Sequence, residues 1–156
     1  MKVSKILVPI DFSEQSRFAL EEADRIAVEQ DAELTLLHVH QIVQLAILEF
    51  TFVEPAPRIA SIVEAAEKHL AEWAAGLQSK KTHVLVDTGQ PLAVIIEHSE
   101  RHDLIVISTH GRTGPSHFLL GSVAERVVQG AKCSVLVVKR SSRPQQTAHD
   151  AEPTQQ

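Results

Sequence analysis

Two patterns of apolar residues alternate along the chain. Short apolar runs, rich in β-branched residues, predict five strands at residues 5–10, 33–40, 82–87, 104–108 and 134–139. Between them, apolar residues recur at helical spacing and predict helices at residues 13–30, 59–77, 91–100 and 122–129. The last two strands are apolar throughout, which is typical of parallel strands covered on both faces. The chain therefore predicts an α/β fold, a doubly wound parallel sheet with helices on both faces.

Local signals mark several ends of these elements. Pro9 ends the first strand, and Ser13 is expected to be the N-cap of the first helix. Pro57 and Pro91 suit the first turns of the second and third helices. Gly130 is expected to stop the last helix, because glycine commonly follows helix ends.

Two segments do not fit this framework. Residues 41–58 form a long and apolar connection, which argues against a freely solvated loop. We expect this segment to cover the side of the sheet where the carboxyl ends of the strands lie. It would act there either as a lid or as a segment packed permanently on the body or on a partner subunit. Residues 141–156 contain alanine as their one apolar residue type and predict a disordered tail after a single domain at residues 1–140.

Composition excludes several classes of function. The 156 residues include 15 Lys and Arg against 20 Asp and Glu, and a net charge of −5 argues against nucleic-acid binding as the main task. The single cysteine, Cys133, excludes a disulfide framework and a zinc site built on several thiolates. We see no signal peptide, and the longest apolar stretch, 42–53, is too short to span a bilayer, so we expect a cytoplasmic protein.

The segment after the fourth strand carries the clearest candidate chemistry. Residues 108–122 contain three glycines, several hydroxyl side chains and one arginine, and they end where a helix begins. Gly121 would let a phosphate approach the free N–H groups at the helix start, and Ser122 offers both its hydroxyl and its amide. An ordinary loop with a Gly-Ser cap is the alternative. The dinucleotide and P-loop glycine motifs are both missing from the sequence.

Other candidate groups are weaker. His38 and His40 lie two apart on a strand and suit a metal pair, but no third ligand is identifiable. His110 and His117 flank the loop and would either touch phosphate or remain exposed. Asp11 lies between the first strand and the first helix. Its negative charge would stabilise the start of that helix, a role that is compatible with ligand contact. No catalytic residue can be assigned, because no general base or catalytic triad is identifiable in the sequence.

Four motifs in the same order resemble the universal stress protein family. The family's nucleotide signature is Gly-x2-Gly-x9-Gly-Ser/Thr, and this chain has Ser108-x2-Gly111-x9-Gly121-Ser122. The opening at 8–13, the Leu-His-Val at 37–39 and the closing strand at 133–138 also match in kind and spacing. The resemblance covers about residues 3–140. The signature's first glycine is Ser108 here, which leaves room for weaker binding.

The resemblance implies a parallel sheet in the order 3-2-1-4-5, usually in a dimer that often binds ATP. The residues that it implies for the site extend over three parts of the chain. The triphosphate would be lined by Gly111, Arg112, Gly121, Ser122 and Val123, with His110 and Ser108 beside them. Asp11 would contact the ribose or accompanying Mg²⁺, Val39 would meet adenine through its backbone, and Pro9 and Ile10 would shape the wall.

The resemblance favours an ATP-binding regulatory module in the stress response. A slow ATPase or self-phosphorylating enzyme and a nucleotide-free dimeric interaction protein are the alternatives. In the family's strand order, the apolar residues 135–138 lie at a sheet edge, where we expect a homodimer to form.

Overall fold

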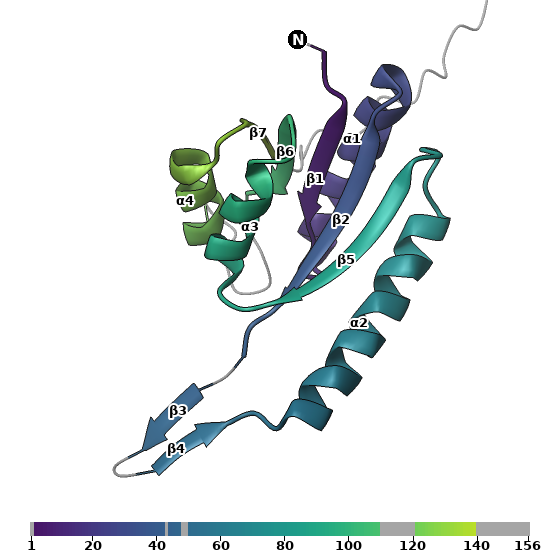
Figure 1. Cartoon of the computed structure of the whole chain (residues 1–156). Coiled ribbons are helices and arrows are strands. Elements are labelled where there is room, and N and C mark those ends of the chain that lie inside the picture. The colour runs from purple at the N-terminus through teal and green to yellow at the C-terminus, as the bar shows by residue number, and fades with distance from the viewer. Residues whose placement is uncertain (1, 43, 48–49, 110–120, 140–156) are drawn as a thin grey trace, which may run out of the picture.

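The computed structural model describes residues 2–42, 44–47, 50–109 and 121–139, and strands alternate with helices along it (Figure 1). The elements are β1 (Lys5–Pro9), α1 (Glu14–Gln30), β2 (Glu33–His40), β3 (Gln44–Ile47), β4 (Phe50–Val53), α2 (Ala56–Ala75), β5 (Thr82–Thr88), α3 (Pro91–Ser99), β6 (Leu104–Ser108), α4 (Ser122–Gly130) and β7 (Ser134–Val138). All the predicted helices and strands are confirmed, while β3 and β4 were not predicted. Residues 110–120 and the expected tail at 141–156 lie outside the described residues.

Five parallel strands form one sheet in the order β5-β2-β1-β6-β7. This is the order 3-2-1-4-5 among the predicted strands, so the expected fold class and topology are confirmed. β2 pairs along its length with β5, and β6 pairs with β7 through to Ser108 and Val138. The remaining strands, β3 and β4, form a separate antiparallel pair.

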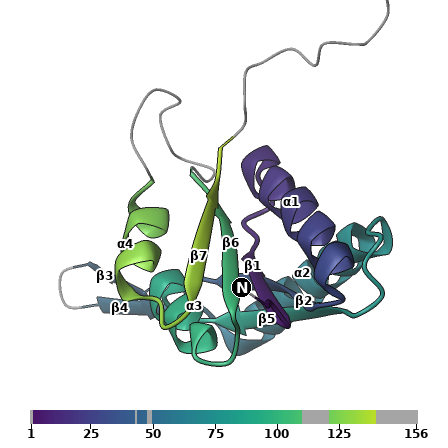
Figure 2. The same ribbon diagram turned by 90° about the horizontal axis from the view of Figure 1, so that it is seen from above.

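Helices cover both faces of the sheet, with α1 and α2 on one side and α3 and α4 on the other (Figure 2). Successive residues of the central strand β1 belong alternately to the cores on the two faces of the sheet. Ile6 and Val8 belong to the core cluster under α1 and α2, whereas Leu7 belongs to the cluster under α3 and α4. Both faces exclude water, so every position in the middle of this strand is apolar, as the continuous runs predicted.

Most of the predicted helix ends are observed. Ser13 is the N-cap of α1, where its hydroxyl accepts from the Ser16 N–H, and Pro57 and Pro91 lie in the first turns of α2 and α3. The role predicted for Gly130 is wrong, because Gly130 is still helical and Ala131 is the C-cap. A Cβ atom at Gly130 would lie 2.6 Å from Cδ1 of Ile96, so close packing of α4 against α3 explains this glycine.

The connection between β2 and α2 differs from our expectation. Its strands β3 and β4 pair with each other rather than with the main sheet, with Gln44 opposite Val53 and Ile47 opposite Phe50. Figure 1 shows the hairpin at the lower left, extending away from the five-stranded sheet. The expectation that this segment covers the edge of the sheet is therefore wrong for its described strands, whereas packing on a partner subunit stays a prediction.

Candidate functional site

The candidate site lies where β1 and β6 separate at their carboxyl ends. β1 pairs with β2 up to Pro9 and Leu37, whereas the ladder between β1 and β6 joins Ile6–Leu7 to Leu104–Ile105. Both strands continue beyond that ladder, so no ladder pair joins their carboxyl ends. We call the region between these ends, from the Asp11 turn to the start of α4, the crevice. The chain also changes direction across the sheet here, because β2 lies on one side of β1 and β6 on the other. Such a switch point is where open α/β sheets bind their ligands.

Asp11 forms one side of this crevice, in the turn between β1 and α1. Its Oδ1 atom accepts hydrogen bonds from the Ser13 N–H at 3.0 Å and from the Ser13 hydroxyl at 2.5 Å. The same Ser13 hydroxyl accepts from the Ser16 N–H at 3.1 Å, which links Asp11 to the first turn of α1. The carboxylate is thus held in place at the end of β1, next to a helix start where negative charge is favoured.

The end of β2 fixes the backbone that precedes Asp11. Ile10 donates its N–H to the Leu37 carbonyl at 2.7 Å, and His38 donates from Nδ1 to the Ile10 carbonyl at 2.7 Å. Because a carbonyl oxygen only accepts, the proton must be on Nδ1. Val39 pairs with Asp87 on β5 and packs against the core under α3 and α4.

His38 and His40, which the sequence offered as a weak metal pair, have separate partners. His38 bonds to Ile10, whereas His40 contacts the buried carboxylate of Glu54 at 3.1 Å between Nε2 and Oε2. Arg58 contacts the other oxygen of the same carboxylate at 3.3 Å. Within the described part of the chain, no group of three or more His, Cys, Asp or Glu residues has the arrangement for a metal ion.

The opposite side of the crevice is formed by the end of β6 and the start of α4. Thr109 donates its N–H to the Val138 carbonyl at 3.1 Å, and Gly121 donates its N–H to the Thr109 carbonyl at 2.6 Å. These two bonds place the first turn of α4 beside the carboxyl end of β6. The N-cap of α4 is Gly121, which has no side chain to accept from the first-turn N–H groups, and Val123 is 42% exposed. A helix start of this kind suits an anionic ligand.

Most of the predicted site residues lie at this crevice. Pro9, Ile10 and Asp11 come from the β1 end, Val39 from the β2 end, Ser108 from the β6 end, and Gly121, Ser122 and Val123 from the α4 start. His110, Gly111 and Arg112 lie outside the described residues. The ring contacts of Phe12, next to Asp11, with His69 and Trp73 were not predicted, because these residues are far apart in the sequence.

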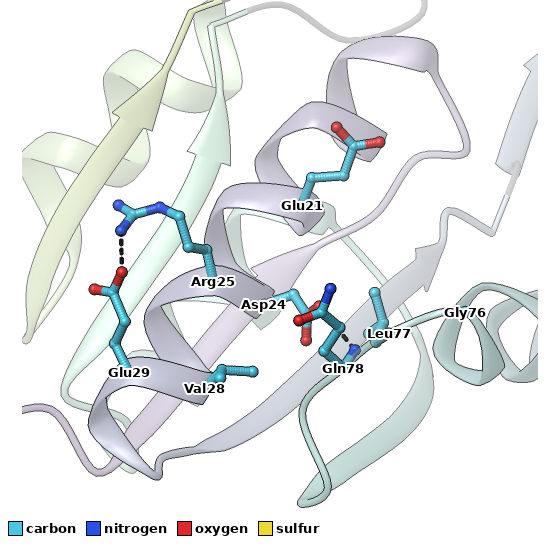
Figure 3. A pocket seen from close by; sticks show the side chains of 8 residues that line it. All are labelled: Glu21, Asp24, Arg25, Val28, Glu29, Gly76, Leu77 and Gln78. Atoms are coloured by element: carbon cyan, nitrogen blue, oxygen red, sulfur yellow. Dashed lines mark hydrogen bonds and ion pairs between the residues drawn. The ribbon is translucent and has the colours of Figure 1, made fainter.

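A pocket lies near the amino ends of the strands, between α1 and the turn that leads into β5 (Figure 3). Three of its four charged lining residues, Asp24, Arg25 and Glu29, are engaged within the protein. Asp24 accepts from the N–H groups of Gln78 and Ser79, each at 2.9 Å. Arg25 is paired with Glu22 at 2.6 Å and with Glu29 at 2.5 Å. The Asp24 bonds explain the local structure of the turn, and the Arg25 pairs lie within α1. Because these charges serve the fold, we favour the crevice as the functional site.

Comparison with known proteins identifies the family. The model of the universal stress protein family matches residues 2–139. The chain belongs to this family. Among its relatives, a universal stress protein of Methanocaldococcus jannaschii is 35% identical over 151 residues, covering 89% of this chain and 84% of that protein. Universal stress protein YxiE of Bacillus subtilis is 31% identical over 151 residues, covering 87% of this chain and 99% of that protein.

Solved structures support the same fold for this universal stress protein. The UspA structure from Lactobacillus plantarum has a TM-score of 0.72 at 25% identity, covering 89% of this chain and 99% of that one. A universal stress protein solved in complex with cAMP has a TM-score of 0.68 at 21% identity, covering 90% of this chain and 100% of that one. Among the described residues, no helix has the length and apolar character needed to cross a membrane.

Proposed function

We propose that this universal stress protein is a regulatory module of the stress response that binds ATP with Mg²⁺ in the crevice between β1 and β6. The observation that carries the proposal is the early end of the β1–β6 ladder at the switch point, with the Asp11 turn on one side and the start of α4 on the other. Nucleotide binding would then alter the shape or the partner choice of the protein. The donors and acceptors on the two sides differ, and each side suits a different part of the ligand.

The phosphate end of the nucleotide fits the start of α4. Amide groups at Ser122 and Val123 would donate to phosphate oxygens, and the helix dipole would stabilise their negative charge. Gly121, whose own N–H bonds to Thr109, would contribute by its lack of a side chain, which lets a phosphate approach the helix start. In our proposal His110, Gly111 and Arg112 complete this side, with Ser108 in place of the glycine that opens the family signature.

The β1 and β2 ends fit the rest of the ligand. Asp11 would bind the ribose or the Mg²⁺ ion, since carboxylate oxygens are the ligands that Mg²⁺ prefers. The backbone of Val39 would meet adenine, and Pro9 and Ile10 would form the adjoining wall. Mg²⁺ would also offset the repulsion between a triphosphate and a protein of net charge −5. The fold neighbour solved with cAMP supports an adenine nucleotide as the ligand class.

Calorimetric titration with ATP tests this proposal. We expect wild type to bind ATP more tightly with Mg²⁺ than without it. Gly121→Val places a branched side chain at the phosphate approach and should weaken binding by roughly tenfold or more. Ser122→Ala removes one hydroxyl and should weaken binding less, by roughly two- to tenfold. Val128→Ala, at a 47% exposed position on the same helix, is the matched control and should bind as wild type does. Equal ATP affinity in wild type and Gly121→Val would contradict the assignment of this loop.

We also propose a homodimer through the edge strand β7. β7 is the last strand of the sheet, so one side of its backbone is left to pair with another chain. Val135, Leu136, Val137 and Val138 make this edge apolar, which favours association. Pairing two such edges about a two-fold axis would extend the sheet across both copies.

Analytical ultracentrifugation tests the dimer. Val137→Lys should raise the monomer fraction, because it introduces a charge that repels its symmetric copy at the edge. Val84→Lys makes the same change on β5 at the opposite edge, where Val84 is 38% exposed, and should leave the dimer intact. Since Val137 also packs against the core, the unfolding temperature of both variants must be measured alongside. Wild type that sediments as a monomer at micromolar concentration would contradict the proposal.

A further inference from the structure

Phe12 adopts an unusual backbone conformation directly beside Asp11. Its φ is +62°, a left-handed value that bulky side chains rarely adopt. Such outliers persist where surrounding contacts over-determine them, and they often occur at functional sites. Phe12 lies between Asp11 and Ser13, whose side chains are hydrogen-bonded to each other. The direction of the Asp11 carboxylate therefore depends on the conformation of this one residue.

Aromatic rings from two other elements surround the Phe12 ring. His69 of α2 stacks flat on it, with ring centroids 4.4 Å apart and an interplanar angle of 3°. His38 of β2 lies 4.6 Å away at a tilt of 41°, and Trp73 of α2 meets the ring edge-on at 5.7 Å. Arg17 of α1 lies 4.4 Å from the Trp73 ring and covers it from above. The Phe12 ring is thus held between β2 and α2.

His69 differs from the other members of this cluster in its surroundings. His38 is tied to the Ile10 carbonyl, and Trp73 packs against the core, so both serve the fold directly. His69 is exposed on α2, and its stack on Phe12 and edge contact with Trp73 are its ring contacts among the described residues. An exposed side chain that lies flat on a strained residue beside the candidate site is suited to fixing the shape of that site.

We propose that His69 is a positioning residue for the nucleotide site. Its stack on Phe12 holds residues 11–13 in the conformation that presents Asp11 to the ligand, and it couples α2 to the crevice. Without the stack, the Phe12 ring keeps its contacts with His38 and Trp73 but loses the one that lies flat on its face. The restraint that keeps this backbone at positive φ is then weaker, and Asp11 is held less firmly in its direction. This inference rests on the proposed nucleotide binding.

A pair of substitutions at His69 separates positioning from a merely structural role. His69→Ala removes the stack and should weaken ATP binding by roughly two- to tenfold, the range expected for one aromatic pair. His69→Phe restores a flat ring and should restore the affinity of wild type. Lys68→Ala, at the neighbouring exposed position, is the control and should not change affinity. Amide exchange without nucleotide should be faster at residues 11–13 in His69→Ala than in His69→Phe.

The outcomes distinguish this inference from the proposed function. If wild type binds ATP and His69→Ala binds equally well, the inference is overturned and the proposed function stands. If His69→Phe binds as weakly as His69→Ala, stacking is not the cause and the inference is again overturned. If wild type does not bind ATP, the proposed function fails and the inference fails with it.

Discussion

Single polar side chains hold together backbone segments that are far apart in the sequence. Asp24 of α1 is 9% exposed, yet its two carboxylate oxygens accept from the consecutive backbone N–H groups of Gln78 and Ser79 in the turn before β5. The bond from Gln78 is drawn in Figure 3. Ser99 plays a comparable part on the other side of the sheet, where its buried hydroxyl accepts from the Lys132 N–H at 2.9 Å. Buried polar groups of this kind stabilise a fold because their partners would otherwise be left unsatisfied.

Substitution of Asp24 should therefore destabilise the protein. Asp24→Ala leaves two N–H groups without this acceptor, and we expect a loss of about 1–3 kcal/mol in the free energy of unfolding. Asp24→Asn keeps one acceptor oxygen and should fall between wild type and Asp24→Ala. Glu21→Ala, on the same face of α1, is the control and should have the same urea midpoint as wild type. Urea denaturation followed by circular dichroism provides the comparison, and equal midpoints for Asp24→Ala and wild type would refute the role of Asp24.

The spacing of apolar residues predicted a helix or strand correctly wherever one spacing continued through the whole element. Strands β1 and β6 show as continuous apolar runs because both of their faces are buried, and α2 shows as a repeating apolar stripe. The hairpin of β3 and β4 was missed because its apolar residues were attributed to packing on the sheet. Gly130 was misassigned because its close neighbour, Ile96, belongs to another helix, and such a contact leaves no local signal.

The connection between α3 and β6 predicts a pH dependence of stability. Burial lowers the pKa of His102, whose Nδ1 donates to the His98 carbonyl at 2.7 Å and whose Nε2 accepts from the Thr35 hydroxyl at 3.3 Å. In the unfolded chain a histidine protonates near pH 6.5. Below that pH the unfolded state binds more protons than the folded state, so stability is lost as pH falls.

Chemical denaturation between pH 7.5 and 5.5 measures this effect. The free energy of unfolding of wild type should decrease as pH falls through this window, and His102→Gln should reduce the slope because glutamine does not titrate. The lowered carboxylate pKa values of Glu22, Asp31 and Asp103 act at lower pH and do not interfere. His83→Gln makes the same change at an exposed position of β5 and serves as the control. An identical slope in wild type and His102→Gln would rule out His102 as the cause.

At the scale of the whole molecule, the strand order determines which residues meet. Asp11 and Gly121 are far apart in the sequence, and they lie on opposite sides of one crevice because β6 is placed next to β1. The resemblance to universal stress proteins predicted this order, so much of the candidate site was predictable from motifs. The stack of Phe12 on His69 was not, because it depends on how α2 packs across β2. Motifs identify the residues at strand ends, whereas the contacts that position them arise from packing between helices and sheet.

Hydrogen exchange of the amide groups with and without Mg²⁺ and ATP tests the central claim most directly, because it locates the ligand. We expect nucleotide to slow exchange at Asp11–Ser13 and in the first turn of α4, at both sides of the crevice. The turn at Gly76–Gln78 lies near the amino ends of the strands, opposite the crevice. It should exchange equally in both states and serves as an internal control. Protection confined to that turn, or no change at the crevice under saturating nucleotide, would contradict the account.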